Sequence, residues 1–125
     1  MSVLTKSIKI EGDKGDDKIN ALFDTGATYS FISKPIAKKV ATILSLPHPK
    51  VFELAEKGEK LEARERISLD IILNGFTISD DIIVIDNLSE DAIIGAGTMQ
   101  KWRIKLDMES DKVVIDEKAV RLKLI

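Results

Sequence analysis

The sequence predicts an all-β fold, a small closed β-barrel with one short helix, formed by a single domain over residues 1–125. Three observations lead to this prediction. Short segments of alternating or continuous apolar residues recur along the chain. Polar turns, several of them with glycine, separate these segments at short intervals. One segment alone carries a clear helical pattern, and many short strands with frequent turns are typical of a small barrel.

The first predicted elements form a hairpin that leads to an acidic residue. Residues 3–10 mix apolar and polar side chains in the alternation of a strand. A polar, glycine-bearing turn over 11–17 precedes a second, apolar strand over 19–23, which ends at Asp24. A short apolar step follows at 31–32.

The predicted helix begins after Ser33, a suitable N-cap, with Pro35 in the first turn, where a missing N–H is tolerated. Prolines at 47 and 49 stop any continuation. The apolar residues at helical spacing are Ile36, Val40 and Ile43.

The middle of the chain predicts two consecutive hairpins. A strand over 51–55 leads to the polar turn Glu56-Lys57-Gly58-Glu59 and a long return strand over 61–73. Asn74-Gly75 is the strongest short hairpin signal in the chain. One face of the return strand is apolar and is formed by Ile67, Leu69, Ile71 and Leu73.

The remaining strands are short. A strand over 76–79 is followed by Asp80-Asp81, which we interpret as a turn, and by a continuous apolar strand over 82–85 that predicts burial on both faces. The rest of the prediction is a polar loop over 86–91, a buried strand over 92–94 closed by Gly95, one or two helical turns over 98–102, and strands over 103–107, 112–115 and 119–125.

Composition excludes several classes of function. The formal net charge is −2 and charged residues make up 32% of the chain, so no basic bias indicates a nucleic-acid partner. The apolar runs are too short to cross a bilayer, and residues 1–6 lack the apolar stretch of a signal peptide. We therefore expect a soluble, cytoplasmic protein without a membrane or nucleic-acid partner.

The catalytic repertoire is narrow. The absence of cysteine excludes disulfides, thiolate zinc sites and a cysteine nucleophile. The single histidine, His48, lies between two prolines and is interpreted as a solvated loop residue. No carboxylates at metal-ligand spacing accompany Asp86 and Asp91, so we expect no metal and no cofactor. Carboxylates remain as the plausible catalytic groups.

The informative segment runs from Leu22 to Thr28. An apolar strand leads directly into Asp24, so the sheet holds the carboxylate while its oxygens face open space. Gly26 allows a tight turn that brings a backbone N–H close to the acid, and Thr25 adds a hydroxyl with little side-chain freedom. An ordinary Asp-Thr-Gly turn is the competing interpretation of these residues alone.

Phe23-Asp24-Thr25-Gly26-Ala27 resembles the active-site motif of the retropepsin-like aspartic peptidases. Members of that family carry an apolar-apolar-glycine segment downstream, followed by a short helix, and Ala92-Ile93-Ile94-Gly95 with residues 98–102 stand at that place. A β-hairpin flap lies between the two segments in the family and is matched here by 51–67, with its tip at Glu56-Lys57-Gly58-Glu59. The likeness covers most of the chain.

The resemblance implies an aspartic endopeptidase of the acid-protease barrel type, in which the chain is one half of a two-fold homodimer. Each chain gives one aspartate, Asp24, to a shared site that acts on a peptide or protein substrate. One carboxylate must be ionised to take a proton from water, and the other must be protonated to stabilise the developing oxyanion. No cofactor is implied.

The resemblance also implies roles for the neighbouring residues. Thr25 reaches across the dimer axis to brace the partner's loop, and Gly26 donates its N–H to the carboxylate. Ala27 and Thr28 complete the active-site loop. The segment that supports this loop from below is Ile93, Ile94 and Gly95.

Three departures from the family pattern keep a second interpretation open. Thr28 replaces the Asp, Asn or Ser of many relatives, Ala63 stands where a second flap glycine is frequent, and Ala96-Gly97 follow Gly95 where relatives often have an acidic residue. The alternative is a catalytically weak or inactive dimeric module of the same fold that binds peptides.

A third interpretation rests on residues 24–30, which also resemble the first phosphate loop of the actin and sugar-kinase superfamily, Asp-x-Gly-x-Thr-x-Ser. That fold requires two large lobes and a second phosphate loop. A chain of 125 residues cannot supply them.

Overall fold

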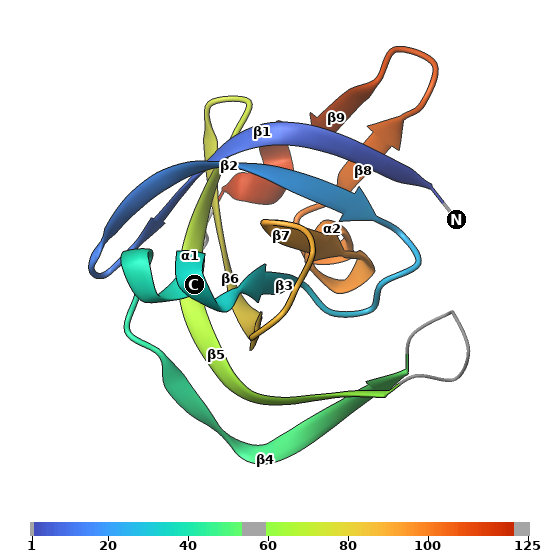
Figure 1. The fold of residues 1–125 in the computed structure, drawn as a ribbon. Coiled ribbons are helices and arrows are strands. Elements are labelled where there is room, and N and C mark those ends of the chain that lie inside the picture. The colour runs from blue at the N-terminus through green and yellow to red at the C-terminus, as the bar shows by residue number, and fades with distance from the viewer. Residues whose placement is uncertain (1, 54–59, 122–125) are drawn as a thin grey trace.

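The computed structural model describes residues 2–53 and 60–121, so the predicted turn Glu56-Lys57-Gly58-Glu59 lies outside the described residues. A single curled sheet dominates the molecule, and a small separate hairpin lies beside it (Figure 1). The elements in chain order are β1 (Val3–Gly12), β2 (Gly15–Asp24), β3 (Phe31–Ser33), α1 (Lys34–Val40), β4 (Leu44–Glu53), β5 (Lys60–Leu73), β6 (Phe76–Ile85), β7 (Ala92–Gly95), α2 (Ala96–Lys101), β8 (Ile104–Asp107), β9 (Lys112–Ile115) and the 3₁₀ helix η1 (Glu117–Val120).

The sheet closes on itself, which confirms the predicted all-β barrel. Strands are hydrogen-bonded in the order β1-β2-β7-β3-β6-β5, and β5 pairs back to β1 at Ile10↔Ile71. The barrel is mixed, because β2–β7 and β3–β6 are parallel pairs while the others are antiparallel. Strand β4 adds to β5 outside the closed ring.

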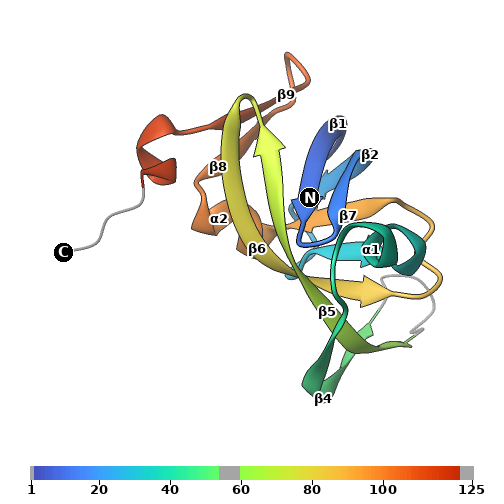
Figure 2. The same cartoon turned by 90° about the vertical axis from the view of Figure 1, so that its left-hand side faces the viewer.

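The core follows from the apolar alternation of the strands. The predicted inward face of β5 is buried throughout, with Ile67 and Ile71 almost inaccessible to solvent. Figure 2 shows β5 and β6 as long curved ribbons that extend along much of the molecule. The largest fully buried side chains are Phe23, Ile10, Ile32, Ile67, Ile71, Ile78, Ile82, Ile94 and Val40.

The continuous apolar run in β6 serves two separate clusters, which confirms its predicted burial on both faces. Ile82 and Val84 belong to the barrel core. Ile83 and Ile85 face the other way and form a second cluster with Ala63 of β5. The partly buried side chains packed on this second cluster are Phe31, Leu46, Phe52, Leu61 and Leu88.

The turn between β5 and β6 is the one predicted from Asn74-Gly75. Both residues have positive φ angles, 51° for Asn74 and 81° for Gly75. This is the type I′ geometry whose twist matches that of antiparallel strands, and glycine and asparagine adopt it at little cost.

The helix and the proline segment differ from the prediction. Helix α1 begins after Ser33, which makes no side-chain cap hydrogen bond, and ends at Val40, before Ile43. The segment with Pro47 and Pro49 belongs to strand β4 instead of a loop. The prolines fit there because the β4–β5 ladder is interrupted between Ser45 and Lys50, where no proline N–H is needed.

Asp80-Asp81 is not a turn, since β6 continues through both residues. Each carboxylate is satisfied by a hydroxyl from another element: Thr98 donates to Asp80 at 2.6 Å, and Ser68 donates to Asp81 at 2.9 Å. Turn propensity is therefore outweighed by partners that lie far away in the sequence.

The predicted last strand over 119–125 is also wrong in its described part. Residues Glu117–Val120 form the 3₁₀ helix η1, which Asp116 caps by accepting the Lys118 N–H at 2.9 Å. Residues 122–125 lie outside the described part of the chain. None of the described helices is both long and apolar enough to span a bilayer.

The β1–β2 turn is tied to the segment after α1 through Asp13. Thr42 donates its backbone N–H to Oδ1 of Asp13 at 2.7 Å and its hydroxyl to Oδ2 at 2.5 Å. The hydroxyl bond is the main reason that the pKa of Asp13 lies below its usual value. Because the folded pKa is depressed, this stabilisation is present above the unfolded pKa and is lost as the pH falls through the folded one.

We predict that Thr42→Val lowers the melting temperature at pH 7, and that the difference from the unsubstituted chain shrinks as the pH falls below the usual aspartate pKa of 3.8 and Asp13 becomes protonated. Thermal unfolding followed by circular dichroism across this pH range is the measurement. Thr77→Val is the matched control, since Thr77 is exposed on β6 and should change little at any pH. If Thr42→Val lowers the melting temperature by the same amount at every pH, the bond between Thr42 and the Asp13 carboxylate is not the cause.

Candidate active site

Asp24 lies at the last position of β2, where the strand leaves the barrel. Strand β2 is fixed on both sides, by β1 through Val3↔Asp24 and by β7 through Asp24↔Gly95. The side chain is half-buried, whereas Thr25 and Gly26 are exposed. The sheet therefore holds the acid while the following loop lies at the surface.

The loop folds back on the carboxylate as the sequence predicts. The N–H of Gly26 donates to Oδ1 of Asp24 at 2.8 Å. The N–H of Ala27 donates to the backbone oxygen of Asp24 at 3.2 Å, which closes the turn. A charge-assisted bond from a backbone N–H fixes the orientation of the carboxylate.

Thr25 is held by its own chain. Its hydroxyl accepts the Ser2 N–H at 2.8 Å and donates to the Ser2 carbonyl oxygen at 3.2 Å. The Thr25 N–H donates to the same Ser2 oxygen at 3.0 Å, so the β1–β2 ladder continues one residue past Asp24. The predicted reach of Thr25 across a dimer axis stays a prediction.

The predicted support segment lies directly against the loop. Ala96 donates its N–H to the Ala27 oxygen at 2.6 Å, and Gly97 donates to the Thr28 oxygen at 3.0 Å. A Cβ at Gly95 would lie 2.2 Å from the Tyr29 oxygen, so glycine is required at this close approach. The neighbouring isoleucines pair in register with both flanking strands, through Leu22↔Ile93, Phe23↔Ile94 and Phe31↔Ile93.

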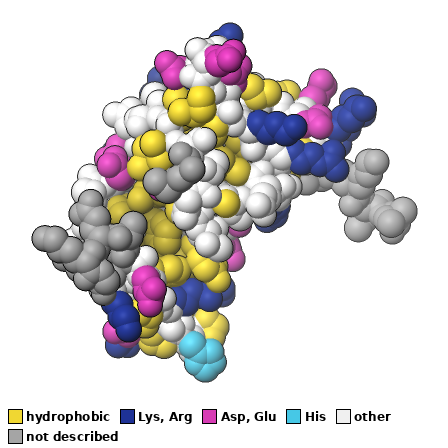
Figure 3. Space-filling view, turned by 90° about the vertical axis from the view of Figure 1, so that its right-hand side faces the viewer, with side chains coloured by type: hydrophobic (Ala, Val, Ile, Leu, Met, Phe, Trp, Pro, Cys, Tyr) yellow, Lys and Arg dark blue, Asp and Glu magenta, His cyan; other side chains and the backbone are white. Residues whose placement is uncertain are grey.

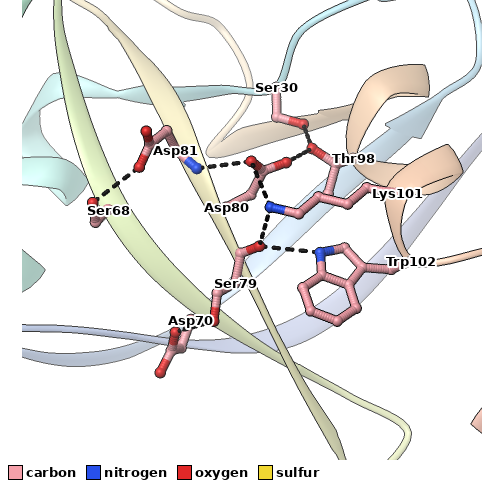
Figure 4. A network of polar contacts seen from close by, with 9 residues as sticks. All are labelled: Ser30, Ser68, Asp70, Ser79, Asp80, Asp81, Thr98, Lys101 and Trp102. Carbon is pink, nitrogen blue, oxygen red and sulfur yellow. Dashed lines mark hydrogen bonds and ion pairs between the residues drawn. The ribbon is translucent and has the colours of Figure 1, made fainter. Parts of the chain in front are cut away.

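A chain of hydrogen bonds below the loop was not predicted from the sequence (Figure 4). The Gly95 N–H donates to Oγ of Ser30 at 2.9 Å, and the Ser30 and Thr98 hydroxyls lie 2.6 Å apart. Thr98 donates to Oδ2 of Asp80 at 2.6 Å. Because the Thr98 hydroxyl donates its hydrogen to the carboxylate, the Ser30 hydroxyl must donate to Thr98. All the hydrogen bonds of this series therefore point toward Asp80.

This chain of bonds joins three distant segments in a buried place. Ser30 and Thr98 are each 3% exposed. Helix α2 is further attached to β6 by Trp102, whose indole N–H donates to the Ser79 oxygen at 3.0 Å, and by Lys101, whose ammonium lies 3.8 Å from Asp80. No local sequence signal marks Ser30, Asp80 or Thr98 as partners, since their separation along the chain hides the contact.

The β4–β5 hairpin packs beside the segment that follows the Asp24 loop, where Tyr29 contacts Phe52. Its described strands pair at Val51↔Glu62 and Phe52↔Leu61, at the place of the predicted flap, while the flap tip is not among the described residues. Phe52 packs edge-on against Phe31 and Tyr29, with ring centroids 5.0 and 5.4 Å apart. Figure 3 shows hydrophobic side chains gathered in a hollow on the face of the molecule that lies on the right-hand side of Figure 1.

A large cavity of the described chain lies away from this site. It has a volume of about 730 Å³ and is lined by residues such as Asp13, Thr42 and Asp70, and by none of residues 24–28. Size alone is a poor guide here, because the Asp24 loop opens onto the surface of a single chain. The described residues contain no group of three or more His, Cys, Asp or Glu side chains placed to hold a metal ion.

Known proteins share this architecture. Residues 16–121 match the family described as retroviral aspartyl protease. The chain is similar to the retroviral protease-like domain of Ddi1 from Leishmania major, with 19% identity, a TM-score of 0.67, and coverage of 94% of this chain and 90% of that chain. It is also similar to the EIAV protease in complex with the inhibitor HBY-793, with 21% identity, a TM-score of 0.58, and coverage of 86% and 94%. No curated protein sequence matches the chain.

We predict that Thr98→Val destabilises the protein by about 1–3 kcal/mol, because it leaves the Ser30 hydroxyl and the Asp80 carboxylate without their shared partner. Thr98→Ser is the matched control, since it keeps the hydroxyl and should retain most of the stability. Urea unfolding followed by Trp102 fluorescence measures both. Equal stability of the valine and serine variants would show that the bond chain contributes little.

Proposed function

This chain belongs to the retroviral aspartyl protease family, and on that premise we propose that it is an aspartic endopeptidase that acts as a homodimer. The observation that carries the proposal is the placement of Asp24 at a fixed strand end, with its carboxylate held by the Gly26 N–H at the start of a surface loop. The proposed reaction is hydrolysis of a peptide bond by a water molecule that the Asp24 carboxylates of two chains activate.

The requirement for two chains follows from the chemistry. Hydrolysis needs a base that removes a proton from water and an acid that donates a hydrogen bond to the scissile carbonyl. The Asp-Thr-Gly motif occurs once in the sequence, so one chain supplies only one of these groups. Two carboxylates about 3 Å apart cannot both ionise and so share one proton, for which aspartic proteases are the standard example.

In the proposed reaction, the ionised Asp24 accepts a proton as the water oxygen attacks the carbonyl carbon. The protonated Asp24 of the other chain stabilises the oxyanion of the tetrahedral intermediate. Transfer of a proton to the amide nitrogen then allows the carbon–nitrogen bond to break, which gives a carboxylic acid and an amine. The nucleophile is water throughout, so no acyl-enzyme forms.

The apolar hollow supports a substrate with bulky hydrophobic side chains at the scissile bond. The second hydrophobic cluster includes Ala63 of the β4–β5 hairpin, and the partly buried side chains of Phe31, Phe52 and Leu61 pack on it. These partly buried side chains would gain further burial when a peptide lies between the hairpin and the Asp24 loop. We propose that the hairpin acts as the flap that covers the peptide and excludes water from the reaction.

We predict that sedimentation equilibrium at micromolar concentration gives about twice the chain mass of 13.9 kDa. The physical reason is the single catalytic aspartate per chain. A strict monomer that nevertheless cleaves peptides would contradict the shared site.

We predict that Asp24→Asn abolishes peptide cleavage while the dimer stays folded, because asparagine keeps the shape of the side chain but cannot serve as the ionised base. In the unsubstituted protein the rate should rise and then fall with pH, with an optimum on the acidic side of neutral, because one carboxylate must be ionised and one protonated. Initial rates on a fluorogenic peptide between pH 3 and pH 8 measure both.

Two results would redirect the proposal. Full activity in Asp24→Asn, or a rate that climbs steadily into alkaline pH, would place the chemistry elsewhere. Peptide binding without turnover in the unsubstituted dimer would favour the inactive binding module over the peptidase.

A further inference from the structure

A charged pocket lies at the end of the Asp24 loop that is farther from the acid. Its volume is about 440 Å³, and its walls come from the end of the active-site loop, the β4–β5 hairpin, strand β6 and helix α2. Thr28 and Tyr29 line it, whereas residues 24–27 do not. A peptide running past Asp24 would therefore place in this pocket a side chain that lies some positions away from the scissile bond.

Three of the side chains that line this pocket are cationic. Lys50 lies on β4, Arg66 on β5 and Lys101 on α2. The Lys50 ammonium is 5.3 Å from the centre of the Tyr29 ring, which places it over an aromatic wall of the pocket. Both Lys50 and Arg66 are half-buried.

The carboxylates that share the pocket already have partners. Asp80 accepts the Thr98 hydroxyl and lies 3.8 Å from the Lys101 ammonium. Asp81 accepts the Ser68 hydroxyl at 2.9 Å. Within residues 2–53 and 60–121, neither Lys50 nor Arg66 forms an ion pair with a carboxylate.

Two half-buried cations without a carboxylate partner in the described chain favour an anionic ligand. Partial desolvation of a charge is unfavourable unless an opposite charge compensates it. A guanidinium offers forked donors that match a carboxylate, and an ammonium adds a second charge-assisted bond. The aromatic ring of Tyr29 and the side chain of Ile83 provide apolar surface for the methylene groups of the same ligand.

We propose that this pocket is a specificity subsite for an acidic side chain, Asp or Glu, of the peptide substrate, and that Lys50 and Arg66 determine this preference. The inference rests on the proposed peptidase function and extends it. The protein then selects peptides with a bulky apolar pair at the scissile bond and a carboxylate at one position farther along the chain.

The test uses decapeptides built around a central Phe-Leu bond, with alanine elsewhere and a single Glu or Gln placed in turn at each remaining position. At one position the kcat/KM of the Glu peptide should exceed that of the Gln peptide by about tenfold, as for a hydrogen bond to a charged group. Arg66→Gln and Lys50→Gln should each reduce this Glu-to-Gln ratio severalfold. The preference should also weaken with added salt, because the pocket is partly exposed.

Lys18→Gln is the matched control, since Lys18 is exposed on β2 and outside this pocket and the substitution removes one positive charge. It should leave both the ratio and the activity as they are. Equal cleavage of Glu and Gln peptides at every position, or a preference that survives in both pocket variants, overturns the subsite.

Failure of the peptidase proposal is distinguishable from failure of the subsite. If no peptide is cut, fluorescence anisotropy measures binding of the same labelled peptides to the Asp24→Asn protein. A Glu-over-Gln preference that Arg66→Gln removes supports the pocket even without turnover. Equal binding of the two peptide series overturns it.

Discussion

The parallel pairing of β2 with β7 is the constraint on which the rest of the structure depends. It places Phe23 beside Ile94 and Asp24 beside Gly95, although these residues are far apart in the sequence. The pairing is possible only because Gly95 has no side chain where the Tyr29 oxygen approaches. From this register follow the position of the acid, the contact between Ala27 and Ala96, and the start of helix α2.

The buried hydrogen bonds between hydroxyl groups hold these segments rigidly in that register. A backbone N–H of Gly95, the two hydroxyls of Ser30 and Thr98, and the carboxylate of Asp80 have their protons arranged in one direction. Such an arrangement satisfies every polar atom in it and admits one orientation of each hydroxyl. The segment that follows the Asp24 loop thus rests on a support of fixed geometry, and the proposed catalytic role of Asp24 requires such precise positioning.

Much of the fold could be predicted from the sequence because the burial of one face of a strand requires apolar residues at every second position. The alternation of Ile67, Leu69 and Ile71 and the turn chemistry of Asn74-Gly75 are local signals, and the Asp-Thr-Gly segment is recognisable by its short motif. The errors have a common cause. Asp80 and Asp81 have turn propensity, yet hydroxyls from Thr98 and Ser68 stabilise them within a strand, and such partners leave no local trace. Pro47 and Pro49 suggest a loop, although an interrupted ladder accommodates them within β4.

The prolines of β4 have a consequence for how the molecule behaves in a concentrated solution. In the described chain β4 is the outermost strand of the sheet, with β5 on one side only. An exposed strand edge is a template on which another chain can add a strand, and long, regular edges promote aggregation. Between Ser45 and Lys50 the ladder is broken, and two of the residues in this stretch have no N–H to offer. The free edge of β4, outside the closed ring, therefore offers fewer hydrogen-bond donors along this stretch to a strand of another molecule.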